Sequence, residues 1–105
     1  MIQTAVNPIA VPPDVSAFAA AQGVAAELPA VVAMTQRVFP DATLSVSLED
    51  DPEIPNDCHI LLAAREVNLD VDESLAASWE WDRQLFLLAP APKVCIFRLS
   101  MAGVR

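Results

Sequence analysis

The sequence is poor in the residues that many catalytic and cofactor sites require. It has only two glycines, Gly23 and Gly103, so it cannot form a glycine-rich loop of the kind that cradles phosphate. It has a single histidine, His59, which excludes a multi-histidine metal site and leaves a Ser-His-acid arrangement without support. We therefore predict no catalytic residue, no cofactor and no metal ligand, and we expect that the protein is not an enzyme.

Basic residues are also scarce. Six Lys and Arg stand against fourteen Asp and Glu, which gives a formal net charge of -8. Nucleic acids and anionic membrane surfaces attract clustered positive charge, so neither is expected as a partner. The apolar runs are too short to span a bilayer. These absences leave another protein as the expected partner, and a basic one would complement the charge.

Only two cysteines, Cys58 and Cys95, are present, and the first residues lack the basic and then apolar pattern of a secretory signal. We therefore expect a cytoplasmic protein, bacterial in style, with reduced thiols. Cys58 and His59 are adjacent and look like a nucleophile and its base. They fall in a predicted strand, where neighbouring side chains point to opposite faces, so the two are not expected to share a hydrogen bond.

A chain of 105 residues has room for one hydrophobic core. Residues 1–13 contain three prolines and no sustained hydrophobic period, so they predict an extended N-terminal arm that either docks along the domain or stays loose. Residues 14–105 are predicted to form a single α+β domain.

Two helices are predicted at the start of this domain. The first covers residues 15–22, with Asp14 as its N-cap and Gly23 at its end. The second covers residues 25–38 and stops before Pro40. Apolar residues recur along the second helix at helical spacing and are expected to face the core: Leu28, Val31, Val32, Thr35 and Phe39.

A strict alternation marks the first strand. Residues 43–49 read Thr-Leu-Ser-Val-Ser-Leu-Glu, which places Leu44, Val46 and Leu48 on the core face and the polar residues on the other. The acidic, proline-containing segment 50–57 connects this strand to a second one over residues 58–67. The two strands are predicted to form a wide hairpin.

A third helix is predicted to start at Asp70, with Glu73 at the capping-box position, and to reach about residue 89 before a final strand over 94–101. The order is therefore α-α-β-β-α-β. The helix between the last two strands makes them parallel, and strand orders 2-1-3 and 1-2-3 both remain open. The predicted fold is a two-layer α+β sandwich with helices on one face of a small three-stranded mixed sheet.

Nine of the fourteen carboxylates lie between Glu49 and Glu73. The hairpin connection lacks the acidic register and the glycine of a calcium-binding loop, so a metal is not predicted there. Capping and the helix dipole explain the acids that follow Asp70. A solvated turn is the plain interpretation of the hairpin acids, and an acidic partner-binding surface is the functional one: Glu49, Asp50, Asp51 and Glu53.

The third helix contains a broad apolar stripe that is predicted to face the core: Val71, Leu75, Trp79, Leu85, Phe86 and Ala89. Asp82 falls near the middle of this stripe. It is expected to sit near the sheet edge, to pair with an arginine such as Arg65 or Arg98, or to line a contact with a partner or subunit. Trp81 lies off the stripe, so it is expected at an interface or under the N-terminal arm.

The face of the sheet away from the helices is predicted to be partly apolar, and to carry His59. Leu61, Val94 and Ile96 are the apolar residues expected there, and we assign Leu61 and Ile96 to a binding surface. Either the N-terminal arm or a second copy of the protein would cover them.

Three functions remain for such a chain. The favoured one is a small acidic interaction module that neutralises or adapts a basic protein, such as the toxic partner of a neutralising pair. The second is a structural subunit that forms a homodimer through its open sheet face, with the acids serving solubility. The third is a small enzyme or metal binder that uses Asp82, His59 and the hairpin acids.

Overall fold

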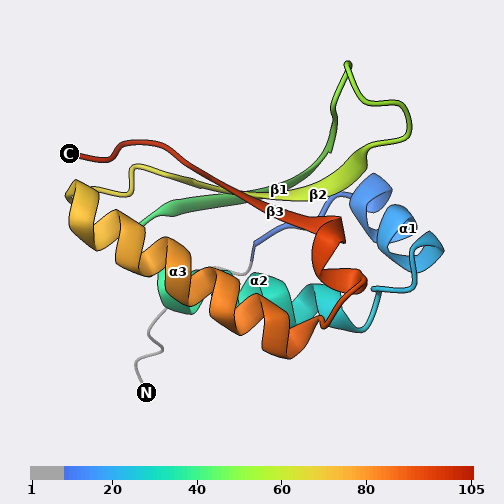
Figure 1. Ribbon diagram of the computed structural model, residues 1–105, viewed down its shortest axis with the longest axis horizontal. Helices are drawn as coiled ribbons and strands as arrows, with labels where there is room; N and C mark the ends of the chain where they lie inside the picture. Colours follow the sequence, from blue (N-terminus) through green and yellow to red (C-terminus); the bar gives the residue numbers. More distant parts are fainter. Residues whose placement is uncertain (1–8) are drawn as a thin grey trace.

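The computed structural model describes residues 9–105, which form the predicted order of elements (Figure 1). Residues 1–8 of the expected N-terminal arm lie outside the described residues. Within the described range the elements are α1 (Pro13–Ala21), α2 (Glu27–Val38), β1 (Thr43–Asp50), β2 (Cys58–Arg65), α3 (Val71–Leu88), a 3-10 helix η1 (Lys93–Ile96) and β3 (Phe97–Met101). The chain is a small α+β protein with a three-stranded mixed sheet, as the sequence predicts.

The first two helices end where the sequence indicates. α1 begins one residue before the predicted N-cap, and Asp14 lies in its first turn, where its carboxylate accepts a 2.9 Å hydrogen bond from the Val15 amide. Gly23 follows the helix with a φ of 74°, a left-handed conformation that favours glycine. α2 keeps its proline in the first turn, and all five residues predicted to face the core are buried.

The sheet has the order β1-β2-β3, which is the second of the two orders left open by the sequence. β1 and β2 are antiparallel, with Val46 opposite Leu62, and β2 and β3 are parallel, with Leu62 opposite Leu99. β2 carries apolar residues on both faces, since Leu61 and Ala63 alternate with buried neighbours. A strand of that kind suits the centre of a sheet.

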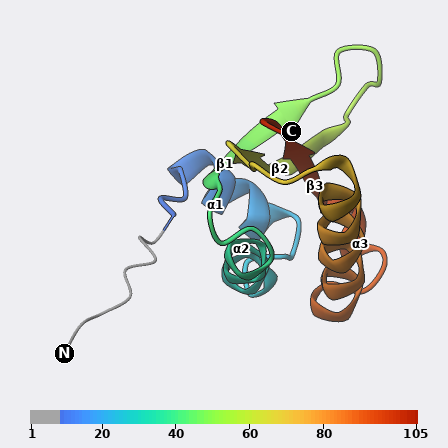
Figure 2. The ribbon, with the colours of Figure 1, turned by 90° about the vertical axis from the view of Figure 1, so that its left-hand side faces the viewer.

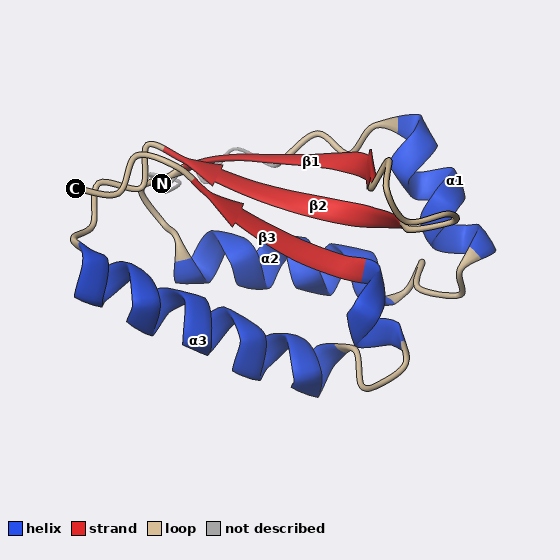
Figure 3. Cartoon of the chain, turned by 45° about the horizontal axis from the view of Figure 1, so that its top comes forward, coloured by secondary structure: helices blue, strands red, loops and turns tan. Residues whose placement is uncertain are grey.

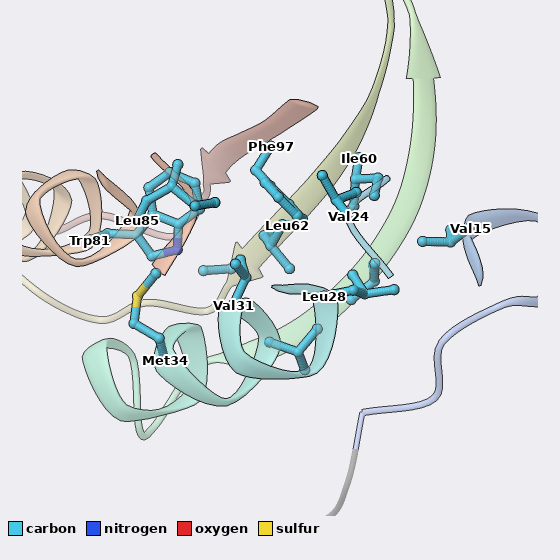
Figure 4. Packing of buried hydrophobic residues seen from close by; sticks show 14 of the residues in the cluster. Val15, Val24, Leu28, Val31, Met34, Ile60, Leu62, Trp81, Leu85 and Phe97 are labelled. Atoms are coloured by element: carbon cyan, nitrogen blue, oxygen red, sulfur yellow. The ribbon is translucent and has the colours of Figure 1, made fainter. Parts of the chain in front are cut away.

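Helices α2 and α3 lie side by side on one face of the sheet, whereas α1 lies near the hairpin end of β1 (Figures 2 and 3). Buried residues from all three helices and all three strands form one hydrophobic core. Figure 4 shows Trp81 and Leu85 of α3 turned toward Val31 and Met34 of α2. Within residues 9–105, no helix lies over the other face of the sheet (Figure 2).

The predicted capping box at the start of α3 is present. Asp70 accepts a 2.8 Å hydrogen bond from the Glu73 amide, and the Glu73 side chain accepts a 3.1 Å hydrogen bond from the Asp70 amide. These bonds satisfy amide groups that the helix itself leaves unpaired. The capping box therefore fixes the residue at which α3 begins.

The last strand is shorter than predicted. Lys93–Ile96 forms a 3-10 helix, and the Lys93 ammonium lies 2.8 Å from the Glu27 carboxylate at the start of α2. Beyond β3 the chain continues beside the segment that follows β2, with Gly103 at a φ of 81°. A Cβ atom at Gly103 would lie 2.9 Å from the Glu66 Cα, so this close backbone approach requires glycine.

Candidate functional site

The orientation of α3 differs from the prediction, and the difference defines the candidate site. Trp81, expected at an interface, is 2% exposed and lies in the core. Its indole Nε1–H donates a 2.9 Å hydrogen bond to Thr35 Oγ1 of α2. Leu85 is buried on the same side, and Ala89, which follows the last residue of α3, is also buried. The other members of the predicted stripe are not buried.

The remaining members of the predicted stripe face solvent. Val71, Leu75, Trp79 and Phe86 are between 48% (Leu75) and 70% (Trp79) exposed. At about 100° per residue they fall within an arc of about 80° on the side of α3 turned away from α2. We call these four residues the α3 stripe. Leu87, also 70% exposed, falls about 80° outside this arc in the same projection.

The α3 stripe is the largest concentration of exposed apolar side chains in the part of the chain that the structure describes. Besides the stripe and Leu87, the large apolar residues exposed in residues 9–105 are Ile54 and Val104. Single exposed apolar residues are ordinary on protein surfaces, but a continuous row on one helix marks a contact surface. Trp and Phe are also the residue types that contribute most where proteins bind.

Asp82 lies within the α3 stripe and is exposed. Neither of the arginines expected to pair with it does so: Arg98 binds Asp57 at 3.0 Å, and Arg65 makes no ion pair with Asp82. Among residues 9–105, no side chain forms an ion pair or hydrogen bond with the Asp82 carboxylate. The prediction of an intramolecular pair is therefore wrong, and the alternative of a partner contact stays a prediction.

Glu80 and Arg83 form an ion pair on α3, outside the arc of the α3 stripe. The Arg83 guanidinium donates hydrogen bonds of 2.9 and 2.6 Å to the two carboxylate oxygens of Glu80, and the Gln84 amide donates a third of 2.7 Å. The hydrogen bonds from Arg83 have the largest effect and the bond from Gln84 the second largest, and together they lower the pKa of Glu80 from 4.5 to about 2. Arg83 is therefore already engaged within its own helix.

Replacing Arg83 with methionine is expected to raise the pKa of Glu80 toward 4.5. The folded-state pKa lies below the unfolded value, so the pair stabilises the fold above pH 4.5 and its contribution is lost as the pH falls toward about 2. Carboxyl carbon shifts followed by NMR titration at low salt measure this pKa. Arg65→Met is the matched control and should leave it unchanged. A Glu80 carboxyl that titrates near 4.5 in the wild-type protein would contradict the pairing.

The predicted acidic surface lies at the hairpin, which bends away from the helices and projects from the body of the protein (Figure 1). Asp51 accepts a 2.9 Å hydrogen bond from the Glu53 amide, which stabilises the turn. Glu49, Asp50 and Glu53 are exposed, with Ile54 between the two prolines of the tip. Within the described residues, no group of three His, Cys, Asp or Glu side chains could hold a metal ion.

His59 lies on the predicted face of the sheet but is not exposed there. It is 2% exposed, and its Nε2 lies 2.8 Å from Glu49 Oε1 on the neighbouring strand. Its Nδ1 is buried, has no hydrogen-bond partner and lies 4.0 Å from Asp57 Oδ2. Asp57 in turn binds the Arg98 guanidinium. The His59 ring is therefore buried beside Glu49 and Asp57 and is not part of an exposed sheet face.

Cys58 points to the opposite face of β2 from His59, as predicted for neighbours in a strand. Burial raises the pKa of the Cys58 thiol, and a hydrogen bond with Asp50 and nearby carboxylate charges raise it further. A raised pKa makes a thiol less reactive. Asp82 is on α3, across the sheet from His59, so the structure does not bring together the residues of the enzyme or metal hypothesis.

The apolar patch predicted on the open sheet face is absent. Val94 and Ile96 lie in the 3-10 helix, where both are half-buried against the core, because the strand starts only at Phe97. Leu61 alone lies on the open face, half-buried, with Arg98 beside it on β3. The observation that suggested a homodimer through this face is therefore lost, and Ile96 is not part of a binding surface there.

A separate apolar pocket of about 370 Å³ lies between α1, α2 and the segment before α1. Ile9 and Val11 form one wall, and Leu28 and Val32 of α2 form another. Residues 9–11 of the predicted arm therefore pack beside the helices and not on the open sheet face.

No family model, curated protein or solved structure compared with the chain matches it. Among residues 9–105, the helices lack the combination of length and apolar character that crossing a bilayer requires.

Proposed function

We propose that the protein is an interaction module that binds another protein through the α3 stripe. The observation that carries this proposal is the row of exposed apolar side chains on one helix, with Trp79 at its centre. Removing such a row from water stabilises a complex by roughly 25 cal/mol per Å² of apolar surface, before the costs of association. The folded domain gains nothing from this exposure.

The negative charge of the hairpin acids supports the proposal that the partner is a basic protein. Among the ion pairs of residues 9–105, Glu49 is the only one of the four hairpin acids with a basic side chain beside it, which is His59. Together with the net charge of -8, they create a negative field that attracts a basic protein and speeds its association. The proposal is therefore a small acidic module that neutralises or adapts a basic protein.

Photo-crosslinking in the native cell tests the surface directly. A photoreactive amino acid in place of Trp79 should yield a covalent adduct of defined mass with one other protein. The same amino acid in place of Arg37, which is exposed on α2, is the matched control and should yield none. Adducts from Arg37 alone, or from neither position, would contradict the proposal.

The crosslinked partner then allows affinity to be measured. Trp79→Ala is expected to weaken binding by about 2 kcal/mol or more, the range of interface hot spots, which is about 30-fold. Neutralising Glu49, Asp50, Asp51 and Glu53 together is expected to slow association and flatten its salt dependence, with a smaller effect on dissociation. Affinity that is indifferent to Trp79→Ala would exclude the α3 stripe as the contact.

A further inference from the structure

The position of Asp82 constrains what can cover the α3 stripe. At about 100° per residue, Asp82 falls between Val71 and Leu75 in projection, inside the apolar arc, and is the single charged residue there. Any surface that covers the stripe must remove this carboxylate from water. A buried carboxylate without a cation is strongly destabilising, so the covering surface has to supply one.

A second copy of this chain cannot supply that cation from the same helix. The only basic residue of α3 is Arg83, and two hydrogen bonds already hold it on Glu80. A symmetric pairing of two stripes would enclose two Asp82 carboxylates and add no free cation. Each copy also carries a net charge of -8, which opposes association.

A partner helix meets the requirement. The stripe extends along most of α3, which has 18 residues, and matches the length over which two amphipathic helices pack. Asp72 lies at the start of α3 and adds negative charge at one end, whereas Glu73 lies 3.7 Å from the Arg105 guanidinium. An anionic lipid surface would be repelled by the same carboxylates.

We propose that the α3 stripe binds an amphipathic helix of another protein, with an arginine or lysine in the middle of its apolar face that pairs with Asp82. This inference rests on the proposed function and adds the chemistry of the partner. Arginine suits the position better than lysine, because its guanidinium can bind a carboxylate through two parallel hydrogen bonds.

Designed peptides test the inference on the full chain. Three helical peptides of 18 residues share one apolar face and differ at its central position, which is Arg, norleucine or Glu. Calorimetry with the wild-type protein should show the Arg peptide binding about tenfold or more tightly than the Glu peptide. Asp82→Asn, which keeps the size of the side chain, should reduce this ratio to about threefold or less. Trp79→Ala should weaken binding of all three peptides.

Each contrary outcome is informative. A ratio that Asp82→Asn leaves unchanged, or no binding of any peptide, would overturn the inference. The inference would also be overturned if sedimentation velocity showed a wild-type dimer that Trp79→Ala dissociates. The α3 stripe would then be covered by a second copy of the chain. Binding to lipid vesicles without peptide, lost in Trp79→Ala, would overturn the inference in favour of a membrane. The crosslinking experiment at Trp79 tests the proposed function separately. An adduct with another protein would support that function even if none of the three peptides bound.

Discussion

Replacing Trp81 with alanine is expected to destabilise the protein by about 3–5 kcal/mol, because it opens a cavity between α2 and α3. Trp81 has the largest of the fully buried side chains in the described residues, and it packs with Met34 and Leu85 (Figure 4). Its indole also donates to Thr35 Oγ1, which in turn donates a 2.7 Å hydrogen bond to the Val31 carbonyl. Domains of this size are stable by only about 5–15 kcal/mol, so the loss would remove a large part of the total.

Urea unfolding followed by far-UV circular dichroism measures this loss. Trp79→Ala is the matched control: it makes the same chemical change two residues away, on a side chain that is 70% exposed, and should change stability by about 0.5 kcal/mol or less. Similar losses at the two positions would show that the assignment of buried and exposed faces on α3 is wrong. A reversed result would restore the orientation predicted from the sequence.

The sequence predicts where α3 begins and ends but not how it is rotated. Local hydrogen bonds at Asp70 and a proline after Ala89 set the ends, and both can be recognised from residue types alone. The rotation depends on tertiary contacts, because α3 has large apolar residues on two sides. One signal was present in the sequence: Asp82 in the middle of the favoured stripe, where a buried charge would need a partner.

Small residues on the true core face provided a second signal. Ser74 and Ala77 lie on the same side as Trp81, and their small size allows α3 to approach its neighbours closely. If only the size of the apolar side chains is considered, the face of α3 that carries Trp79 and Phe86 is predicted to lie against the core. The sequence therefore shows the residues of the candidate site as a pattern, but apolar bulk alone predicts that this pattern faces the core.

In the sheet, as in α3, local sequence patterns predict some features, whereas others depend on contacts between residues far apart in the sequence. The alternation around Val46 predicts β1 and its core face correctly, because a strand with one wet face repeats every two residues. β3 starts only after the 3-10 helix, whose Lys93 forms an ion pair with Glu27 at the start of α2. The partners of that pair are far apart in the sequence, so local patterns do not reveal it.

Leu62→Ala is expected to be the second most damaging of these changes, with a loss of about 2–5 kcal/mol. Leu62 is 1% exposed on the central strand, and it lies opposite Val46 on one side and Leu99 on the other. Truncation would leave a cavity between the sheet and α2, which the close-packed neighbouring side chains cannot fill unless the backbone moves.

Leu61→Ala is the control for this experiment, because it makes the same change on the adjacent residue of β2. Leu61 points to the open face, where part of its side chain is already in contact with water, so its loss should cost less than about 1.5 kcal/mol. Urea unfolding of both variants measures the difference. Equal costs would mean that the open face is covered in solution, and the search for a partner would then have to include that face of the sheet as well as the α3 stripe.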